Sequence, residues 1–234
     1  MFEQQVRAVV AETAKLDHEE FTAYSGGWRG YVGTALVDAV FSIRAKYQVK
    51  DPTKGVSGRL KTFNAKYPEA MNDLAALAAV GEQDLAEIMG RTKTGGRTKA
   101  ACVIDAAEAL LALEPPIATA EDLVVADAAA VKAAYTGVHG LGWVTCEYFQ
   151  MLLGVPGVKA DRMIVRFVNA ALAAEGMGPV DARTARELVM QAYAFEPRGE
   201  TPTHYEHAIW RAKGELANTA EEPDPEQTGS EVIQ

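Results

Sequence analysis

The sequence predicts an all-α protein that is built from many short helices. Apolar residues recur at helical spacing along most of the alanine-rich chain, and extended β-branched runs are absent. Of the 234 residues, 48% are hydrophobic and 24% are charged. This is a globular composition, and the length suits one domain or two small lobes with a buried core.

The N-terminal half of the chain is predicted to form five helices. Val6 and Val9 belong to one buried stripe of the first helix. The sequence Ser25-Gly26-Gly27 opens a long and mostly buried second helix, Pro68 separates the third from the fourth, and Gly95-Gly96 precedes the fifth. These helices are expected over residues 1–16, 28–47, 57–66, 69–79 and 99–112.

The C-terminal half is predicted to contain six further helices. Thr119 and Asp127 are typical N-cap residues, and each starts a short helical piece within residues 119–135. Residues 220–234 combine prolines, a glycine and acids with little to bury, which predicts a disordered acidic tail. The remaining helices are expected over residues 142–153, 161–174, 182–194 and 203–216.

Charge is unevenly distributed along the chain. Lys and Arg number 23 against 32 Asp and Glu, and the net charge of −9 excludes a polycation that coats nucleic acid by charge alone. Three stretches are nevertheless basic: residues 41–68 have seven bases and one acid, residues 90–99 have four bases, and residues 155–166 have three bases and one acid. They form an electropositive face only if the fold brings them together.

The two cysteines, Cys102 and Cys146, are too few for a disulfide framework, a four-cysteine zinc site or a cysteine-ligated iron–sulfur cluster. We expect both to be small buried hydrophobic residues in a reduced, cytoplasmic compartment. Residues 1–15 are amphipathic and include two acids, unlike a signal peptide. No apolar run approaches the length of a membrane span, about 18 residues, so we expect a cytoplasmic protein with no membrane partner.

A glycine turn and an aspartate are the first candidate site residues. In Val138-His139-Gly140-Leu141-Gly142, the glycines permit positive φ angles and close backbone approach. Amide groups at the start of the following helix, with Thr145 in its first turn, then point outward, where a phosphate binds. A simple helix–helix turn has the same pattern. Asp161 opens the next helix as an N-cap, or holds a carboxylate beside a sugar cation during glycosyl cleavage.

The turn and the aspartate together resemble a known signature. Residues 138–146 and 160–168 are similar to the helix-hairpin-helix, glycine/proline, aspartate pattern of the endonuclease III superfamily of DNA glycosylases. Residues 39–45 resemble the family's early buried helix, whose C-terminal end meets DNA. Residues 97–104 resemble the helix that precedes the hairpin segment, and the resemblance extends in order over residues 28–214.

The resemblance implies an endonuclease III-like two-lobed helical fold with the active site in the cleft between the lobes. A six-helix barrel lobe with the helix-hairpin-helix motif is expected over residues 28–166. Residues 1–27 and 167–219 are expected to form a second helical lobe, followed by the tail at residues 220–234. The family's iron–sulfur cluster needs four cysteines, so we expect no such cluster here.

The resemblance also implies a monofunctional DNA base-excision repair glycosylase, which hydrolyses the N-glycosidic bond of a damaged or mispaired base in double-stranded DNA. Asp161 matches the family's catalytic carboxylate. Bifunctional members place a lysine two residues after the second hairpin glycine, where this chain has Val144, so strand cleavage through that amine is not expected. We expect a monomer with no cofactor, unless a monovalent cation binds at the hairpin.

Flipping a base out of the duplex requires phosphate anchors and a residue that fills the gap. Arg44 either fills that gap or binds a phosphate. Lys159 and Arg162 flank Asp161 and either contact phosphates or lie in solvent. The predicted DNA-binding residues are His139 (where the family frequently has proline), Gly140, Leu141, Gly142, Thr145, Arg44, Lys159 and Arg162, and the predicted base pocket comprises Ser42, Trp143 and Trp210.

Two other classes of protein fit the same residues. A non-catalytic helix-hairpin-helix protein would keep the fold, bind DNA and use the acidic tail for regulation or partner contact. A protein–protein scaffold would keep the hairpin as a structural relic, which the net charge of −9 favours. His204 and His207 are i, i+3 neighbours, but without a matching carboxylate pattern we expect a capping or surface role for them.

Overall fold

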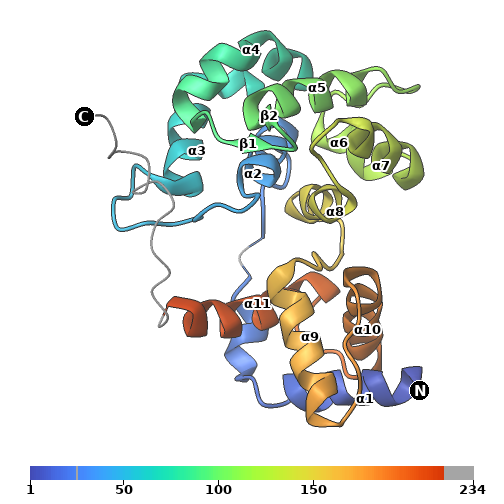
Figure 1. Ribbon diagram of the computed structural model, residues 1–234. Helices are drawn as coiled ribbons and strands as arrows, with labels where there is room; N and C mark the ends of the chain where they lie inside the picture. The colour runs from blue at the N-terminus through green and yellow to red at the C-terminus, as the bar shows by residue number, and fades with distance from the viewer. Residues whose placement is uncertain (25, 219–234) are drawn as a thin grey trace. The chain divides into compact units, whose positions relative to one another are not determined.

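The described chain is helical apart from its loops and one short β-hairpin, so the predicted all-α class is confirmed (Figure 1). The computed structural model describes residues 1–24 and 26–218, with side chains as far as residue 212. The predicted tail, residues 220–234, lies outside the described residues. None of the described helices is both long and apolar enough to cross a membrane.

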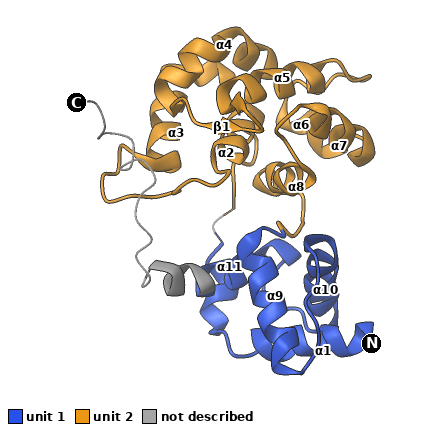
Figure 2. Cartoon of the chain, in the orientation of Figure 1, with its two compact units in different colours: residues 1–24, 160–234 blue, residues 25–159 orange. Residues whose placement is uncertain are grey.

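The chain forms two helical units, which Figure 2 shows in different colours. Unit 1 consists of Met1–Tyr24 and Ala160–Gln234, so it is built from both ends of the chain. Unit 2 consists of the intervening residues, Ser25–Lys159. Asp161 therefore belongs to unit 1, whereas the glycine turn belongs to unit 2.

The helices of unit 1 pack around a buried core of aliphatic and aromatic side chains. α1 packs against α9 and α10, and α11 packs against α9 and the short 3-10 helix η1. Phe21 and Tyr205 are fully buried with ring centroids 5.5 Å apart, and the Tyr205 hydroxyl hydrogen-bonds that of Thr13. The elements of unit 1 are α1 (Phe2–Thr13), η1 (His18–Thr22), α9 (Arg162–Ala174), α10 (Ala182–Phe195) and α11 (Pro202–Asn218).

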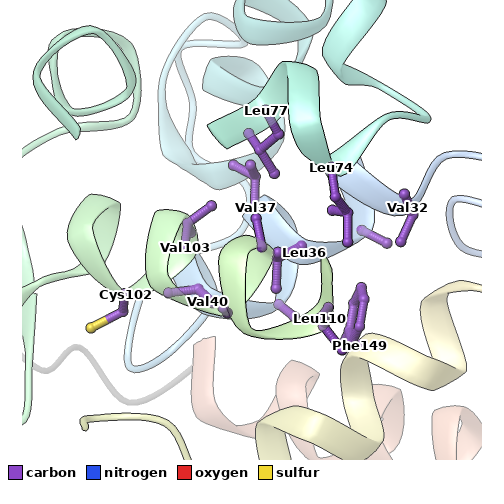
Figure 3. Packing of buried hydrophobic residues seen from close by; sticks show 14 of the residues in the cluster. Val32, Leu36, Val37, Val40, Leu74, Leu77, Cys102, Val103, Leu110 and Phe149 are labelled. Atoms are coloured by element: carbon purple, nitrogen blue, oxygen red, sulfur yellow. The ribbon is translucent and has the colours of Figure 1, made fainter. Parts of the chain in front are cut away.

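Unit 2 surrounds one buried helix, α2 (Val32–Phe41), in which all ten residues are buried. Figure 3 shows its apolar side chains among those of α4, α5 and α8. Each aliphatic side chain removed from water in this way contributes about 1.5–3 kcal/mol. The other elements of unit 2 are α3 (Gly55–Lys66), η2 (Pro68–Ala70), α4 (Leu74–Met89), β1 (Lys93–Thr94), β2 (Arg97–Thr98), α5 (Lys99–Leu111), α6 (Ala120–Val125), α7 (Ala128–Gly137) and α8 (Trp143–Leu152).

The helix predicted over residues 28–47 is wrong at both ends. Only Val32–Phe41 is helical, and Trp28 and Tyr47 instead donate side-chain hydrogen bonds to Asp38 in the middle of the helix. In a continuous helix these residues would lie roughly 15 Å from Asp38 along the axis, so both ends must fold back. The helix predicted over 69–79 is also displaced, because α4 begins at Leu74 and continues through a kink at Gly81 to Met89.

The two cysteines are buried, as expected. The surface role expected for the histidines of α11 is wrong. His204 is buried and its Nδ1 hydrogen-bonds the Thr201 hydroxyl before the helix, as a capping role requires. His207 is partly buried, stacks on Trp210 at a centroid distance of 6.0 Å and contacts the ring of Tyr24. Burial, together with the nearby charges of Arg211 and His204, lowers the pKa of His207 to about 4.

We expect unit 1 to make the protein sensitive to mild acid through His207. The unfolded chain binds a proton at this ring below its ordinary pKa near 6.5, whereas the folded chain does so only near pH 4. Stability is therefore lost as the pH falls from 6.5 to 4, by on the order of 2 kcal/mol. Urea unfolding at pH 7.0 and pH 4.5 should show a smaller loss for His207→Phe, which keeps an aromatic ring.

The matched control is His18→Phe, because His18 is exposed in η1. This variant should lose as much stability as the wild-type protein between the two pH values. An equal loss in the wild-type protein and His207→Phe would contradict the assignment of the acid sensitivity to His207.

Candidate functional site

The turn between α7 and α8 is anchored from inside and open on its outer side. Val138 and Leu141 are buried, and the amide of Leu141 donates to the carbonyl of Val138 at 3.0 Å. Gly140 has a φ of +98°, a conformation that favours glycine. Gly142 has a φ of −127°, and a Cβ built there meets no atom within 4 Å. The second glycine is therefore not required by the protein's own packing.

The β1–β2 hairpin buttresses this turn, and sequence reasoning missed it. Thr94 Oγ1 donates to the carbonyl of Gly140 at 2.8 Å, and His139 Nε2 lies 2.8 Å from the carbonyl of Gly95. The contact is so close that a Cβ on Gly95 would lie 2.7 Å from the Cα of Gly140. Gly95 and Gly96 both have positive φ, as a two-residue hairpin turn requires, so the Gly-Gly pair was the available sequence signal.

The first turn of α8 lacks the side-chain cap found at many other helices of the chain. Asp73, Thr98, Thr119, Asp127 and Asp181 each cap a helix with a side-chain oxygen. Gly142 has no side chain to offer, and Thr145 Oγ1 instead bonds the backbone N–H and carbonyl of Gly142, at 3.3 and 2.9 Å. Helix N-termini attract anions through their amide groups and dipole, so the exposed start of α8 suits a phosphate.

A buried carboxylate in α2 organises a second group of candidate residues. Asp38 is fully buried and accepts three side-chain hydrogen bonds, from Ser42 Oγ at 2.8 Å, Trp28 Nε1 at 2.7 Å and Tyr47 Oη at 2.8 Å. Burial raises the pKa of Asp38, whereas the three hydrogen bonds and the charge of Lys159 oppose that rise. A lone aspartate in an otherwise apolar helix was the only sequence signal for this cluster.

Two predicted residues thus interact with a carboxylate that the sequence analysis did not single out, Ser42 through a hydrogen bond and Lys159 through its charge. The ammonium of Lys159 lies 3.6 Å from the centroid of the Tyr148 ring, a cation–π contact that fixes it near α8. Ser42 donates its hydroxyl to Asp38. Arg44 follows in the same turn and is exposed. Trp143, the first residue of α8, is partly buried.

Asp161 caps α9, so the capping interpretation is confirmed. Its Oδ1 accepts from the amides of Met163 at 2.8 Å and Ile164 at 3.3 Å. The carboxylate is only partly buried, and within the described residues no hydrogen bond reaches its Oδ2. One oxygen is thus committed to the helix and the other is available to a ligand. Two other predicted residues also lie in unit 1: Arg162 is exposed, and Trp210 is 38% exposed and stacked on His207.

This arrangement of elements is similar to that of endonuclease III. A solved structure of a trapped endonuclease III–DNA covalent intermediate, an estranged-adenine complex, matches 88% of this chain and 84% of that chain, with a TM-score of 0.53 and 16% identity. At this identity the likeness shows the fold, which is the endonuclease III-like helical fold that the sequence predicted. No curated protein matches the chain. The chain belongs to the family described as domain of unknown function DUF8548, whose model matches residues 5–214.

We expect Asp38 to be essential for the stability of unit 2. Replacing it with alanine leaves three partly buried donors without this acceptor, and the free energy of unfolding should fall by about 3 kcal/mol or more. Denaturant unfolding measures this loss. Glu87→Ala, on the exposed surface of α4, is the control and should change stability by about 0.5 kcal/mol or less.

A double-mutant cycle separates the hydrogen-bonding role of Asp38 from simple loss of packing. Trp28→Phe removes one donor but keeps an aromatic ring. It should cost at least about 1 kcal/mol in the wild-type protein and clearly less when Asp38→Ala is already present. Additive losses would contradict the network.

Proposed function

We propose that this protein is a DNA-binding, monofunctional N-glycosylase that removes a damaged or mispaired base from double-stranded DNA. The observation that supports the proposal best is the buttressed glycine turn in an endonuclease III-like fold, with an uncapped and sterically open helix start at Gly142. The fold, the turn and an aspartate at the start of α9 were all expected from the residues of one signature.

The turn would bind a DNA phosphate through backbone groups. The side chain of Leu141 is buried and the ring of His139 is engaged by Gly95, so neither side chain needs to read the DNA. Amides at the start of α8 would donate to phosphate oxygens. Arg44, Lys159 and Arg162 would add phosphate contacts or, for Arg44, fill the gap that a flipped base leaves.

Asp161 would stabilise the reaction's transition state. The bond between the sugar and the base breaks with its electron pair going to the base, which takes up a proton. Water then adds to the sugar cation and loses a proton, so one water is consumed, the free base is released and an abasic sugar remains in the strand. The Oδ2 of Asp161 would face the cation and help to deprotonate the water. Ser42 and Trp143, both of unit 2, would line the base pocket.

The absence of an amine at the family's lysine position determines where the reaction stops. Val144 stands there, two residues after Gly142. Since a valine forms no Schiff base, the base is removed by hydrolysis and the DNA strand is left intact. The proposed enzyme is therefore a glycosylase without lyase activity through this position.

A methyl group at Gly142 should block the phosphate without disturbing the fold. Gly142→Ala has no protein atom within 4 Å of its Cβ, so its stability should fall by about 1 kcal/mol or less. We expect its affinity for a DNA duplex to fall about tenfold or more, which is a loss of about 1.4 kcal/mol of binding free energy. Fluorescence anisotropy at fixed salt measures this affinity.

Gly137→Ala is the matched control, because a Cβ on Gly137, at the end of α7, also meets no atom within 4 Å. It should bind DNA like the wild-type protein. Gly140→Ala should instead destabilise the fold, since its Cβ would lie 2.7 Å from the Thr94 carbonyl. If Gly142→Ala and Gly137→Ala bind DNA equally well, the phosphate role of the turn is wrong.

Catalysis by Asp161 can be separated from its capping role with a second N-cap. Asp161→Asn and Asp181→Asn each alter an aspartate that caps a helix of unit 1, so both should change stability to a similar, small extent. Base release from a panel of lesion-containing duplexes should fall at least about 100-fold in Asp161→Asn. It should be unchanged in Asp181→Asn.

The same measurements distinguish a glycosylase from a non-catalytic DNA-binding protein. Salt-dependent DNA binding with no base release by the wild-type protein from any lesion would favour a non-catalytic DNA-binding protein of this fold. Equal base release by both asparagine variants would leave Asp161 with its capping role alone.

A further inference from the structure

The turn that follows α2 is fixed from inside by a buried lysine. Lys99, the first residue of α5, is only 3% exposed, and its ammonium donates to the carbonyls of Phe41 at 3.1 Å and Ile43 at 2.6 Å. A cation that satisfies the last carbonyls of a helix also interacts favourably with the negative end of the helix dipole. Lys99 therefore fixes the point at which α2 ends.

Further hydrogen bonds hold both ends of the turn. Asp38 accepts from the hydroxyls of Ser42 and Tyr47, so one carboxylate joins the first and last residues of the segment. The first amides of α3 complete the arrangement, because Val56 N donates to the Lys46 carbonyl and Ser57 N to that of Tyr47. We call residues 42–47 the α2 turn.

Arg44 lies in the middle of the α2 turn in a strained conformation. Its φ is +50°, and it is the one non-glycine residue with a positive φ within residues 1–24 and 26–218. This left-handed region is unfavourable for a residue with a Cβ, and such strain persists only where the surroundings enforce it. The side chain of Arg44 is exposed, so the strain is enforced by the hydrogen bonds of Asp38 and Lys99 to the neighbouring residues and not by burial of Arg44 itself. The turn therefore presents the Arg44 side chain to solvent from a backbone that is held in place.

We propose that Lys99 and Asp38 are positioning residues that hold the α2 turn rigid before DNA arrives, so that Arg44 is a pre-formed probe for a gap in the base stack. The proposal rests on the proposed DNA-binding function and adds how the duplex is inspected. A rigid probe loses little conformational entropy on insertion, which favours binding where the stack is already broken. Lys99 is buried, so its effect on DNA is transmitted through Arg44.

The charge state of Lys99 is compatible with this role. Burial lowers the pKa of Lys99 to about 8, so the group is still mostly protonated at pH 7. In that state the ammonium has three N–H donors, two of which are used by the carbonyls of Phe41 and Ile43. Methionine has similar length but no donor, whereas arginine keeps donors for the same carbonyls.

The rigidity of the turn can be tested without DNA by limited trypsin digestion at pH 7. The readout is the cleavage ratio, which is the rate of cleavage after Arg44 divided by the rate of cleavage after Lys132. Lys132 is an exposed lysine of α7 in the same unit, so dividing by its rate corrects for global unfolding. Lys99→Met should raise this ratio about tenfold or more, and Lys99→Arg should restore it towards the wild-type value. Lys93→Met, which removes an exposed charge from β1, should leave it unchanged.

Tyr47→Phe provides a second route if Lys99→Met does not fold. It removes the hydrogen bond to Asp38 at the far end of the turn and should also raise the cleavage ratio. An unchanged ratio in the folded variants would overturn the proposal that these residues hold the turn.

The effect on DNA is tested by a double-mutant cycle with Arg44→Ala. The readout is the ratio of affinities for a duplex with one tetrahydrofuran abasic site and for the intact duplex. Arg44→Ala and Lys99→Met should each reduce this preference about tenfold, and Lys99→Met should have no further effect once Arg44→Ala is present. Lys93→Met should leave the preference unchanged in both backgrounds.

The outcomes separate the two proposals. If neither the wild-type protein nor any variant binds either duplex, the proposed function is wrong. The ratio of trypsin cleavage rates would still test whether the turn is rigid. Binding with equal affinity for both duplexes, or additive effects of Lys99→Met and Arg44→Ala, would overturn the role of Lys99 in positioning Arg44.

Discussion

A carboxyl group inside a fully buried helix is the constraint on which much of unit 2 depends. Asp38 lies in α2, where every residue is buried, and a buried carboxylate is tolerated only when its oxygens are hydrogen-bonded. Its partners, Trp28, Ser42 and Tyr47, come from the segments on both sides of the helix. The need to reach Asp38 therefore ends the helix at both sides and creates the turn that exposes Arg44.

A second constraint operates at the α7–α8 turn, where two glycine turns pack against each other. Gly95 and Gly140 approach so closely that neither position accepts a Cβ, and hydrogen bonds from Thr94 and His139 join the two turns. Gly142 is different, because the protein leaves its outer side open. A glycine without an internal packing reason is a reasonable place to look for an external ligand.

Several bases in the basic stretches of the sequence bind other groups of the protein and are not free at its surface. The Lys99 ammonium and Arg59 Nη1 donate to backbone carbonyls at the ends of α2 and α4, and Arg97 pairs with Asp105. These three bases are therefore less available to DNA than a count of charges suggests. Arg44 and Lys93, which come from the same basic stretches, remain exposed.

The sequence by itself determined the helical class, most helix positions and the glycine turn, because helical periodicity, capping residues and glycine are local signals. The endonuclease III-like fold followed from the resemblance of residues 138–146 and 160–168 to a family signature. The identity of Asp161 as an N-cap was also readable locally, from an aspartate before a helical pattern. Only the tertiary structure decided the β-hairpin support of the turn, the burial of Asp38 and Lys99, and the strained Arg44. Each of these depends on contacts between residues far apart in the chain. No local pattern indicates which buried polar group will find its hydrogen-bond partners there.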